Sequence, residues 1–181
     1  MSKNEKNFKI AIVGDKGVGK SKFLSICNIT KHPKEDCVVL QKKLNQTVFK
    51  IKIFKITSID DEKRNNSILN NDCFGVIVMF DMSRRESFEN LVKWIIWLID
   101  SIHYEGFITI LGNYDIENTK FLCTTKEEVS TFLKLKTTNF SFFEIGNKNN
   151  SQKSNLIDSL IKNAASEYEK YLKDKKGCYI F

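Results

Sequence analysis

The sequence predicts an α/β fold, with a mostly parallel six-stranded sheet that carries helices on both faces. Short apolar runs alternate along the chain with amphipathic segments, the order typical of strands joined by crossover helices. The run FGVIVMFD at 74–81 is apolar along its whole length, as expected of a parallel strand buried on both faces. A glycine-rich turn, GDKGVGKS at 14–21, follows the first apolar run and leads into a helical segment. Ligands of such sheets bind beyond the carboxyl ends of the strands, where this turn lies.

The apolar runs account for the expected strands, which are residues 8–14, 37–44, 47–54, 74–81, 106–113 and 140–146. Only Asn45-Gln46 separates the second run from the third, and this short connection predicts a hairpin. The remaining runs are separated by longer segments, which leave room for right-handed crossovers between parallel strands.

Helical periodicity fills most of the intervals between these strands. We expect helices at 20–29, from Ser83 to about Ile102, from Thr125 onward with Val129, Phe132 and Leu133, and at about 155–172. Ser83-Arg84-Arg85-Glu86 and Thr125-Lys126-Glu127-Glu128 match capping boxes, which satisfy free amide groups at a helix start. The expected helix from Ser83 to about Ile102 places its apolar residues on one face. These residues are Phe88, Leu91, Val92, Ile95, Ile99 and Ile102. Trp97 then lies roughly opposite the core, where it either covers a domain edge or binds a partner.

Length and composition indicate one folded domain. The chain has 181 residues, 41% of them hydrophobic. The formal charge of +7 permits an anionic partner, but the lysines are spread along the chain, which favours a solvated surface over nucleic-acid binding. The five cysteines form no CxxC pair, so we expect reduced thiols rather than disulfides or a zinc site. No secretory signal is visible, and the run WIIWLI at 94–99 is too short to span a bilayer.

The turn at 14–21 satisfies the phosphate-loop pattern GxxxxGK(S/T) at every position. Glycine lets successive backbone N–H groups converge on a phosphate chain, and the following helix adds the positive end of its dipole. Lys20 is expected to bridge the terminal phosphates, and Ser21 to offer its hydroxyl to Mg²⁺. The alternative, a tight turn that matches by chance, is disfavoured by the flanking strand and helix. The candidate phosphate-binding residues are Gly14, Asp15, Lys16, Gly17, Val18, Gly19, Lys20, Ser21 and Lys22.

Three further segments are informative beside this loop. They are GVIVMFDMSRRESFENLVKWI at 75–95, ITILGN at 108–113 and FFEIGNK at 142–148. Together with the loop they resemble the Ras superfamily of small GTPases, nearest its Ras and Rab branches, from about Lys9 to the carboxyl terminus. The resemblance implies a P-loop NTPase fold of the Ras-like G-domain type, with GTP or GDP and Mg²⁺ as cofactors. The resemblance also implies a GTP-dependent switch, in which two loops tighten around the terminal phosphate and relax after hydrolysis.

The chain departs from the family's pattern where magnesium is held and phosphate is cleaved. The family's DxxG, which carries a magnesium-associated aspartate, aligns with Lys55-Ile56-Thr57-Ser58, so a base stands where an acid is expected. Asp60 and Asp61 follow closely and replace that acid only if the loop is re-routed, which we disfavour. The neighbouring catalytic glutamine aligns with Ile59, which cannot orient a water molecule.

The first switch and the phosphate loop depart as well. HPKED at 32–36 resembles the segment with a magnesium-binding threonine, but Lys34 stands at the threonine's position. Thr30 is either a substitute ligand or an ordinary residue at a helix end, and we favour the second. Lys16 occupies a position where side chains hinder hydrolysis in this family. Alternatively its charge partly replaces magnesium, although repulsion from Lys20 disfavours a tight arrangement. We therefore assign no catalytic residue and expect a weakened Mg²⁺ site with Ser21 as ligand.

Guanine recognition in the family uses NKxD, in which the aspartate accepts two hydrogen bonds from the base. Here GNYDI keeps Asn113, places Tyr114 at the lysine and brings Asp115 one residue early. Such a shift at a strand end tends to turn a side chain the other way. Tyr114 is able to stack on a base, so selectivity for guanine is weakened without loss of binding being implied. The family's SAK aligns with 146–148, where Asn147 and Lys148 are the candidate contacts, or Lys148 is a solvated loop lysine.

The chain ends with Cys178-Tyr179-Ile180-Phe181, which matches a prenylation box whose final phenylalanine favours geranylgeranyl. Four lysines just upstream, at 170, 173, 175 and 176, add attraction to anionic lipid of about 1 kcal/mol each near the surface. The alternative is an accidental terminal cysteine. We expect a Ras-like G domain at 1–172 and a basic tail at 173–181 that is lipidated at Cys178.

The resemblance and its departures imply a monomeric small GTP-binding protein of the Ras or Rab type, with slow or absent GTP hydrolysis. A prenyl group would hold it at the cytoplasmic face of the plasma membrane or an endomembrane, where it acts in signalling or vesicle traffic. The alternative is a pseudo-GTPase scaffold that holds nucleotide statically or not at all. A P-loop ATPase or small-molecule kinase is disfavoured, because no lid or substrate motif is recognisable.

Overall fold

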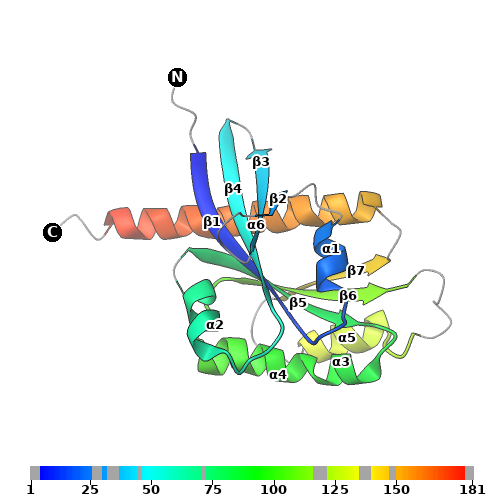
Figure 1. Cartoon of the computed structure of the whole chain (residues 1–181). Helices are drawn as coiled ribbons and strands as arrows, with labels where there is room; N and C mark the ends of the chain where they lie inside the picture. Colours follow the sequence, from blue (N-terminus) through cyan, green and yellow to red (C-terminus); the bar gives the residue numbers. More distant parts are fainter. Residues whose placement is uncertain are drawn as a thin grey trace.

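A seven-stranded sheet runs through the centre of the molecule (Figure 1), with strand order β2-β3-β4-β1-β5-β6-β7. The computed structural model describes residues 5–25, 30–31, 37–44, 46–70, 72–115, 122–134, 140–146 and 150–177. The strands are β1 (Glu5–Val13), β2 (Thr30–Lys31), β3 (Cys37–Leu44), β4 (Thr47–Ile56), β5 (Cys73–Asp81), β6 (Phe107–Tyr114) and β7 (Phe140–Gly146).

The sheet is mostly parallel, which confirms the predicted α/β class. β4, β1, β5, β6 and β7 are parallel neighbours, whereas β2 and β3 each pair antiparallel with the next strand. All six expected strands are present. The seventh, β2, pairs Thr30 with Val39 and Lys31 with Val38, and two residues are too short a run to give a sequence pattern.

The predicted hairpin is confirmed as β3 and β4, which pair antiparallel up to Leu44 and Thr47. β4 then continues beyond the predicted end to Ile56, because it pairs with β1 from Val48 to Ile56. In this register Lys55 lies opposite Ile12, near the carboxyl ends of both strands. The hairpin therefore delivers the end of β4 to the same edge as the glycine-rich turn.

Helices cover both faces of the sheet, as predicted. They are α1 (Lys20–Ser25), α2 (Glu62–Leu69), α3 (Arg85–Glu89), α4 (Leu91–Ile96), the π-helical turn η1 (Trp97–Ser101), α5 (Lys126–Lys134) and α6 (Asn150–Gly177). Figure 1 shows α1 and α6 on one side of the sheet and α2, α3, α4 and α5 on the other. The predicted helix at 20–29 is described as far as Ser25; residues 26–29 lie outside the described part of the chain.

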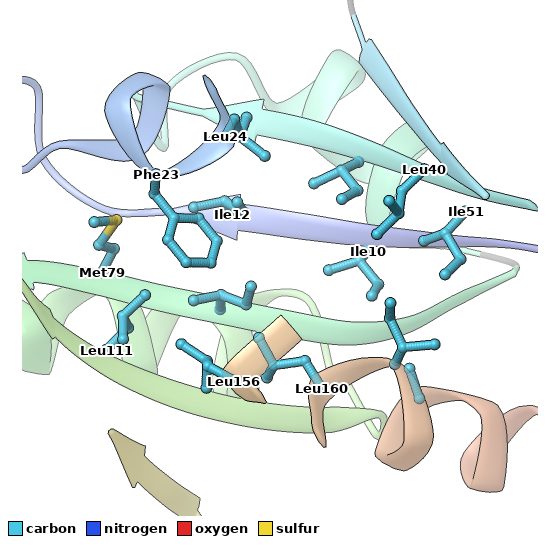
Figure 2. Close-up of a cluster of buried hydrophobic side chains, with 14 of the residues drawn as sticks. Ile10, Ile12, Phe23, Leu24, Leu40, Ile51, Met79, Leu111, Leu156 and Leu160 are labelled. Atoms are coloured by element: carbon cyan, nitrogen blue, oxygen red, sulfur yellow. The ribbon is translucent and has the colours of Figure 1, made fainter. Parts of the chain in front are cut away.

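Two apolar clusters result, one on each face. Along β1, Ile10 and Ile12 belong to the first cluster, whereas Ala11 and Val13 belong to the second, because successive strand residues point to opposite faces. Figure 2 shows the first cluster, in which the side chains of α1 and α6 meet those of the strands: Ile10, Ile12, Phe23, Leu24, Leu40, Ile51, Met79, Leu111, Leu156 and Leu160. The second cluster contains buried side chains of α2, α3, α4, η1 and α5.

The predicted helix from Ser83 to Ile102 is divided into α3, α4 and η1, and two expectations about it are wrong. The first is the capping box: Arg84, not Ser83, precedes the helix, because the Ser83 hydroxyl donates instead to the Asp81 carboxylate at 2.6 Å. The second is the outward Trp97, which is only 6% exposed. Its ring packs edge-on against Trp94 at a centroid distance of 5.7 Å, so the buried face is wider than the predicted stripe.

The last two helices agree with the sequence more closely. The capping threonine of α5 is confirmed, since Thr125 Oγ1 accepts a hydrogen bond from the backbone N–H of Glu128 at 3.2 Å. α6 is longer than the predicted 155–172, extending to Asn150 and Gly177. Its residues Leu160 and Ala164 are buried, as expected, whereas Tyr168 packs against the first cluster while partly exposed. Among the described residues, no helix has both the length and the apolar character needed to cross a membrane.

Candidate functional site: a phosphate loop

The glycine-rich turn has the backbone that a phosphate loop requires. It connects the end of β1 to the start of α1, and three glycines in it have positive φ: +137° at Gly14, +88° at Gly17 and +98° at Gly19. A Cβ on Gly14 would lie 2.1 Å from the carbonyl oxygen of Met79, so no side chain fits there. The sequence motif therefore corresponds to a real loop that wraps at the carboxyl ends of β1 and β5.

Lys20 lies at the base of this loop and is only 5% exposed. Its ammonium donates hydrogen bonds to the carbonyl oxygens of Gly14 and Asp15, the second at 2.6 Å. Burial lowers the pKa of Lys20 to about 8; Asp15 opposes this shift, and the positive charges of Lys55 and Arg84 add to it. Because an ammonium has three N–H donors, one remains for a ligand.

The rest of the loop is fixed by the helices that follow β5. Both carboxylate oxygens of Asp15 accept hydrogen bonds, one from Asn90 Nδ2 at 2.8 Å and one from Trp94 Nε1 at 2.9 Å. The guanidinium of Arg84 donates to the Lys16 carbonyl oxygen at 3.2 Å. Sequence reasoning did not find these loop partners, since residues so far apart in the chain leave no spacing signal.

Ser21, the expected metal ligand, has a cationic partner. The ammonium of Lys55 donates a hydrogen bond to Ser21 Oγ at 3.2 Å. Lys55 itself is held from behind, because its carbonyl oxygen accepts a hydrogen bond from Arg64 Nη2 at 3.2 Å. The base that replaces an expected acid therefore points at the site rather than away from it.

The loop after β4 is tied to α2. Asn65 is fully buried, and its Nδ2 donates to the carbonyl oxygens of Ser58 at 2.9 Å and of Ile59 at 3.2 Å. Asp60 accepts a hydrogen bond from the Ser58 hydroxyl at 2.7 Å, and Asp61 accepts one from the Arg64 backbone N–H as the N-cap of α2. Both carboxylates thus have partners within the loop and helix, which agrees with the expectation that neither replaces the missing acid.

The described residues near the site fit Mg²⁺ poorly. Mg²⁺ prefers oxygen ligands in octahedral geometry, typically including carboxylates. The Ser21 hydroxyl instead faces an ammonium, and both oxygens of Asp15 already accept hydrogen bonds. In the part of the chain that the structure describes, no group of three or more acidic, histidine or cysteine side chains is able to hold a metal ion. The described residues therefore do not provide a complete set of ligands for Mg²⁺.

The candidate base-binding residues are only partly described. Asn113 at the end of β6 donates from Nδ2 to the carbonyl oxygen of Val18 at 3.1 Å, which brings it onto the phosphate loop. Tyr114 is half-buried and packs against the second apolar cluster, and Asp115 follows it directly. Lys16 and Lys22 are exposed on the loop and the first turn of α1. Predictions made for other residues lie outside the described parts of the chain: Lys34, Asn147, Lys148 and Cys178.

Comparisons with known proteins find similarity along most of the chain. The model of the Ras family matches residues 9–166. The Ras-related protein Rab-11B of Dictyostelium discoideum is 29% identical over 112 residues, which are 58% of this chain and 51% of that protein. The Ras-related protein RABA1h of Arabidopsis thaliana is 26% identical over 141 residues, which are 74% of this chain and 64% of that protein. The chain thus covers between 51% and 64% of the length of these relatives.

Proposed function

This chain belongs to the Ras family, and on that premise we propose that it binds GTP and GDP through the phosphate loop and hydrolyses GTP slowly or not at all. The observation that carries nucleotide binding is the assembled loop. Its glycines have the required backbone, Lys20 lies beneath it with a free N–H donor, and Asn113 fastens it to β6. A polyanion fits this position, since backbone N–H groups and a helix start converge there.

Slow hydrolysis is supported by what surrounds the loop after β4. Cleavage of the terminal phosphate requires a residue that orients the attacking water. Ile59, at the position that the resemblance gives to that residue, packs against the second apolar cluster instead. Asp60 and Asp61 are engaged by Ser58 and α2. Of the residues in the family's pattern, this chain keeps the ones proposed to hold phosphate.

We extend the proposal to the base and the membrane. Asn113, Asp115, Asn147 and Lys148 contact the base, with weakened selectivity for guanine. The G domain occupies 1–172, and the basic tail at 173–181 carries a prenyl group on Cys178, so that the protein acts in signalling or vesicle traffic at the cytoplasmic face of a membrane. Supporting observations are the Rab-type relatives and the helix α6, whose last residue, Gly177, directly precedes Cys178.

The second candidate is a pseudo-GTPase scaffold that holds its nucleotide statically or binds none. It is favoured by the hydrogen bonds of Asn65 to the loop after β4, and by the Lys55 hydrogen bond to Ser21. Both tie together segments that would have to move in a switch.

Two measurements on the full-length protein test nucleotide binding and slow hydrolysis. Mass spectrometry of nucleotide released from the native protein is expected to find GDP or GTP, and a single-turnover assay is expected to find little cleavage. Recovery of protein that contains no nucleotide and ignores added GTP would contradict the first candidate. Cleavage at rates ordinary for the family would contradict slow hydrolysis.

Membrane anchoring is tested by fractionation of cells that express the full-length chain. The protein is expected in the membrane fraction, and the Cys178→Ser variant in the soluble fraction, because a prenyl chain supplies most of the apolar attraction. Cys123→Ser is the matched control, since it removes another exposed thiol outside the tail. Equal membrane association of the Cys178→Ser variant and the unmodified sequence would refute lipidation at this residue.

A further inference from the structure

Among the described residues, positive charge gathers at the phosphate loop without a matching set of acids. Lys20 lies beneath the loop, Arg84 contacts the Lys16 carbonyl oxygen beside it, and Lys55 reaches Ser21 from the end of β4. The one carboxylate in the loop, Asp15, has both oxygens occupied by Asn90 and Trp94. The phosphates of a nucleotide would therefore meet fixed cations of the protein itself.

Lys55 has the position and the free donors for direct contact with such a ligand. Its backbone is fixed twice, by pairing of β4 with β1 opposite Ile12 and by the hydrogen bond from Arg64. Its ammonium uses one N–H on Ser21 Oγ, at 3.2 Å, and keeps two for other acceptors. Ser21 is the second residue of α1, so the ammonium lies where the phosphate loop ends.

Given nucleotide binding as proposed above, we propose that the ammonium of Lys55 takes the place of Mg²⁺ at the phosphates, so that this protein binds its nucleotide without a divalent metal ion. A metal ion next to Ser21 would either displace the Lys55 ammonium or be repelled by its positive charge. The protein should then bind the metal-free nucleotide, and Mg²⁺ in solution competes with the protein for the phosphates. Added Mg²⁺ is expected to leave the affinity unchanged or to reduce it, which is opposite to the behaviour of a metal-dependent site.

The test is calorimetric titration of the nucleotide-free, full-length protein with GDP and GTP, in excess MgCl₂ and in excess EDTA. The unmodified sequence should bind at least as tightly in EDTA as in MgCl₂. Lys55→Met should weaken binding in EDTA by about 30-fold or more, the effect of removing one partner of a close charge pair. Lys55→Asp supplies a carboxylate instead, and its binding should become tighter when Mg²⁺ is added.

Lys43→Met is the matched control. Lys43 is an exposed lysine of β3, paired opposite Val48 near the other end of the sheet, so this variant loses the same charge away from the loop. It should behave as the unmodified sequence does in both conditions. If Lys43→Met weakened binding as much as Lys55→Met, the effect would be one of net charge and the proposal would fail.

A second measurement does not depend on how well the Lys55 variants fold. Electron paramagnetic resonance with Mn²⁺ as the probe should detect no protein-bound metal in the nucleotide complex of the unmodified sequence. Bound Mn²⁺, or affinity that falls about tenfold or more when EDTA replaces MgCl₂, would overturn the role of Lys55 while leaving nucleotide binding intact. Absence of binding in both conditions would instead overturn the proposed function.

Discussion

Lys20 is a buried cation whose neighbours include two further cations. Its protonation state is expected to set the affinity of the loop for phosphate. Burial, and then Lys55 and Arg84, lower its pKa to about 8, while Asp15 acts in the opposite direction. Below that pH the ammonium is charged before the ligand arrives. Above it the unliganded protein has lost the proton, and binding of phosphate must take one up.

Nucleotide affinity is therefore expected to be constant near pH 7 and to fall above about pH 8, by up to about tenfold per pH unit, because one proton is bound together with the ligand. Calorimetric titration with GDP between about pH 7 and 9 measures this. Lys20→Arg is the control, since a guanidinium stays charged throughout this range and its profile should be flat. A flat profile for the unmodified sequence would contradict the lowered pKa.

At this scale the sequence predicted the loop residues but not their partners. Gly14, Lys20 and Ser21 lie within one short motif whose spacing encodes a backbone shape. The contacts of Asp15 with Asn90 and Trp94 depend on how α3 and α4 pack across the loop, which no local spacing records. Lys55 was found as a departure from a pattern, yet its hydrogen bond to Ser21 follows from the register of β4 against β1.

Among the elements, α2 has the most direct influence on the site. It fastens the loop after β4 through Asn65, whose Nδ2 has two carbonyl acceptors. Arg64, one residue earlier, reaches back to the carbonyl oxygen of Lys55. The helix thus determines where the end of β4 lies.

Asn65→Ala should lower the free energy of unfolding by about 1–3 kcal/mol, because two carbonyl oxygens lose their donor. Hydrogen exchange of residues 57–61 should rise at the same time, since the loop loses its fixation to α2. Urea denaturation and exchange measured by mass spectrometry provide both readings. Asn66→Ala changes an exposed asparagine of the same helix and should alter neither; an Asn65→Ala protein as stable as the unmodified one would contradict this account.

The sequence predicted the long elements and missed the short or polar ones. Strands such as β5 were recognisable because every residue from Cys73 to Phe80 is buried and apolar or small. α2 was not predicted, since Ile68 and Leu69 are its only buried apolar residues and give no helical period. The burial of Trp97 was missed because the predicted helix assumed one uniform face, whereas the structure ends it in a π-helical turn.

At the scale of the whole molecule, the two faces of the sheet meet at the phosphate loop. β1 contributes alternate residues to both apolar clusters and ends at that loop. On the first face, α1 contributes Ser21. On the second face, α2 contacts Lys55 of β4, and α4 contacts Asp15 of the loop. The class of fold was predictable from the order of the apolar runs, but this convergence depends on the strand order, which the sequence did not show.

These ties make a large rearrangement between GDP and GTP complexes unfavourable. The segment from Lys55 to Leu69 is held by Ser21 on one side and by its own helix on the other. Its hydrogen exchange is expected to be the same in protein loaded with GDP and with a non-hydrolysable GTP analogue, unlike a switch that orders only with the terminal phosphate. Protection that appears in the GTP-analogue complex alone would show a working switch and contradict this prediction.

The edge-on tryptophan pair has a practical consequence. Trp94 and Trp97 are the two tryptophans of the chain, and Trp94 Nε1 donates directly to Asp15 of the phosphate loop. The tryptophan fluorescence of the protein thus arises beside the loop itself, with no distant tryptophan to obscure it. Any event that moves Asp15 changes the surroundings of an indole ring, so the natural chain carries an unlabelled optical reporter of its own ligand site.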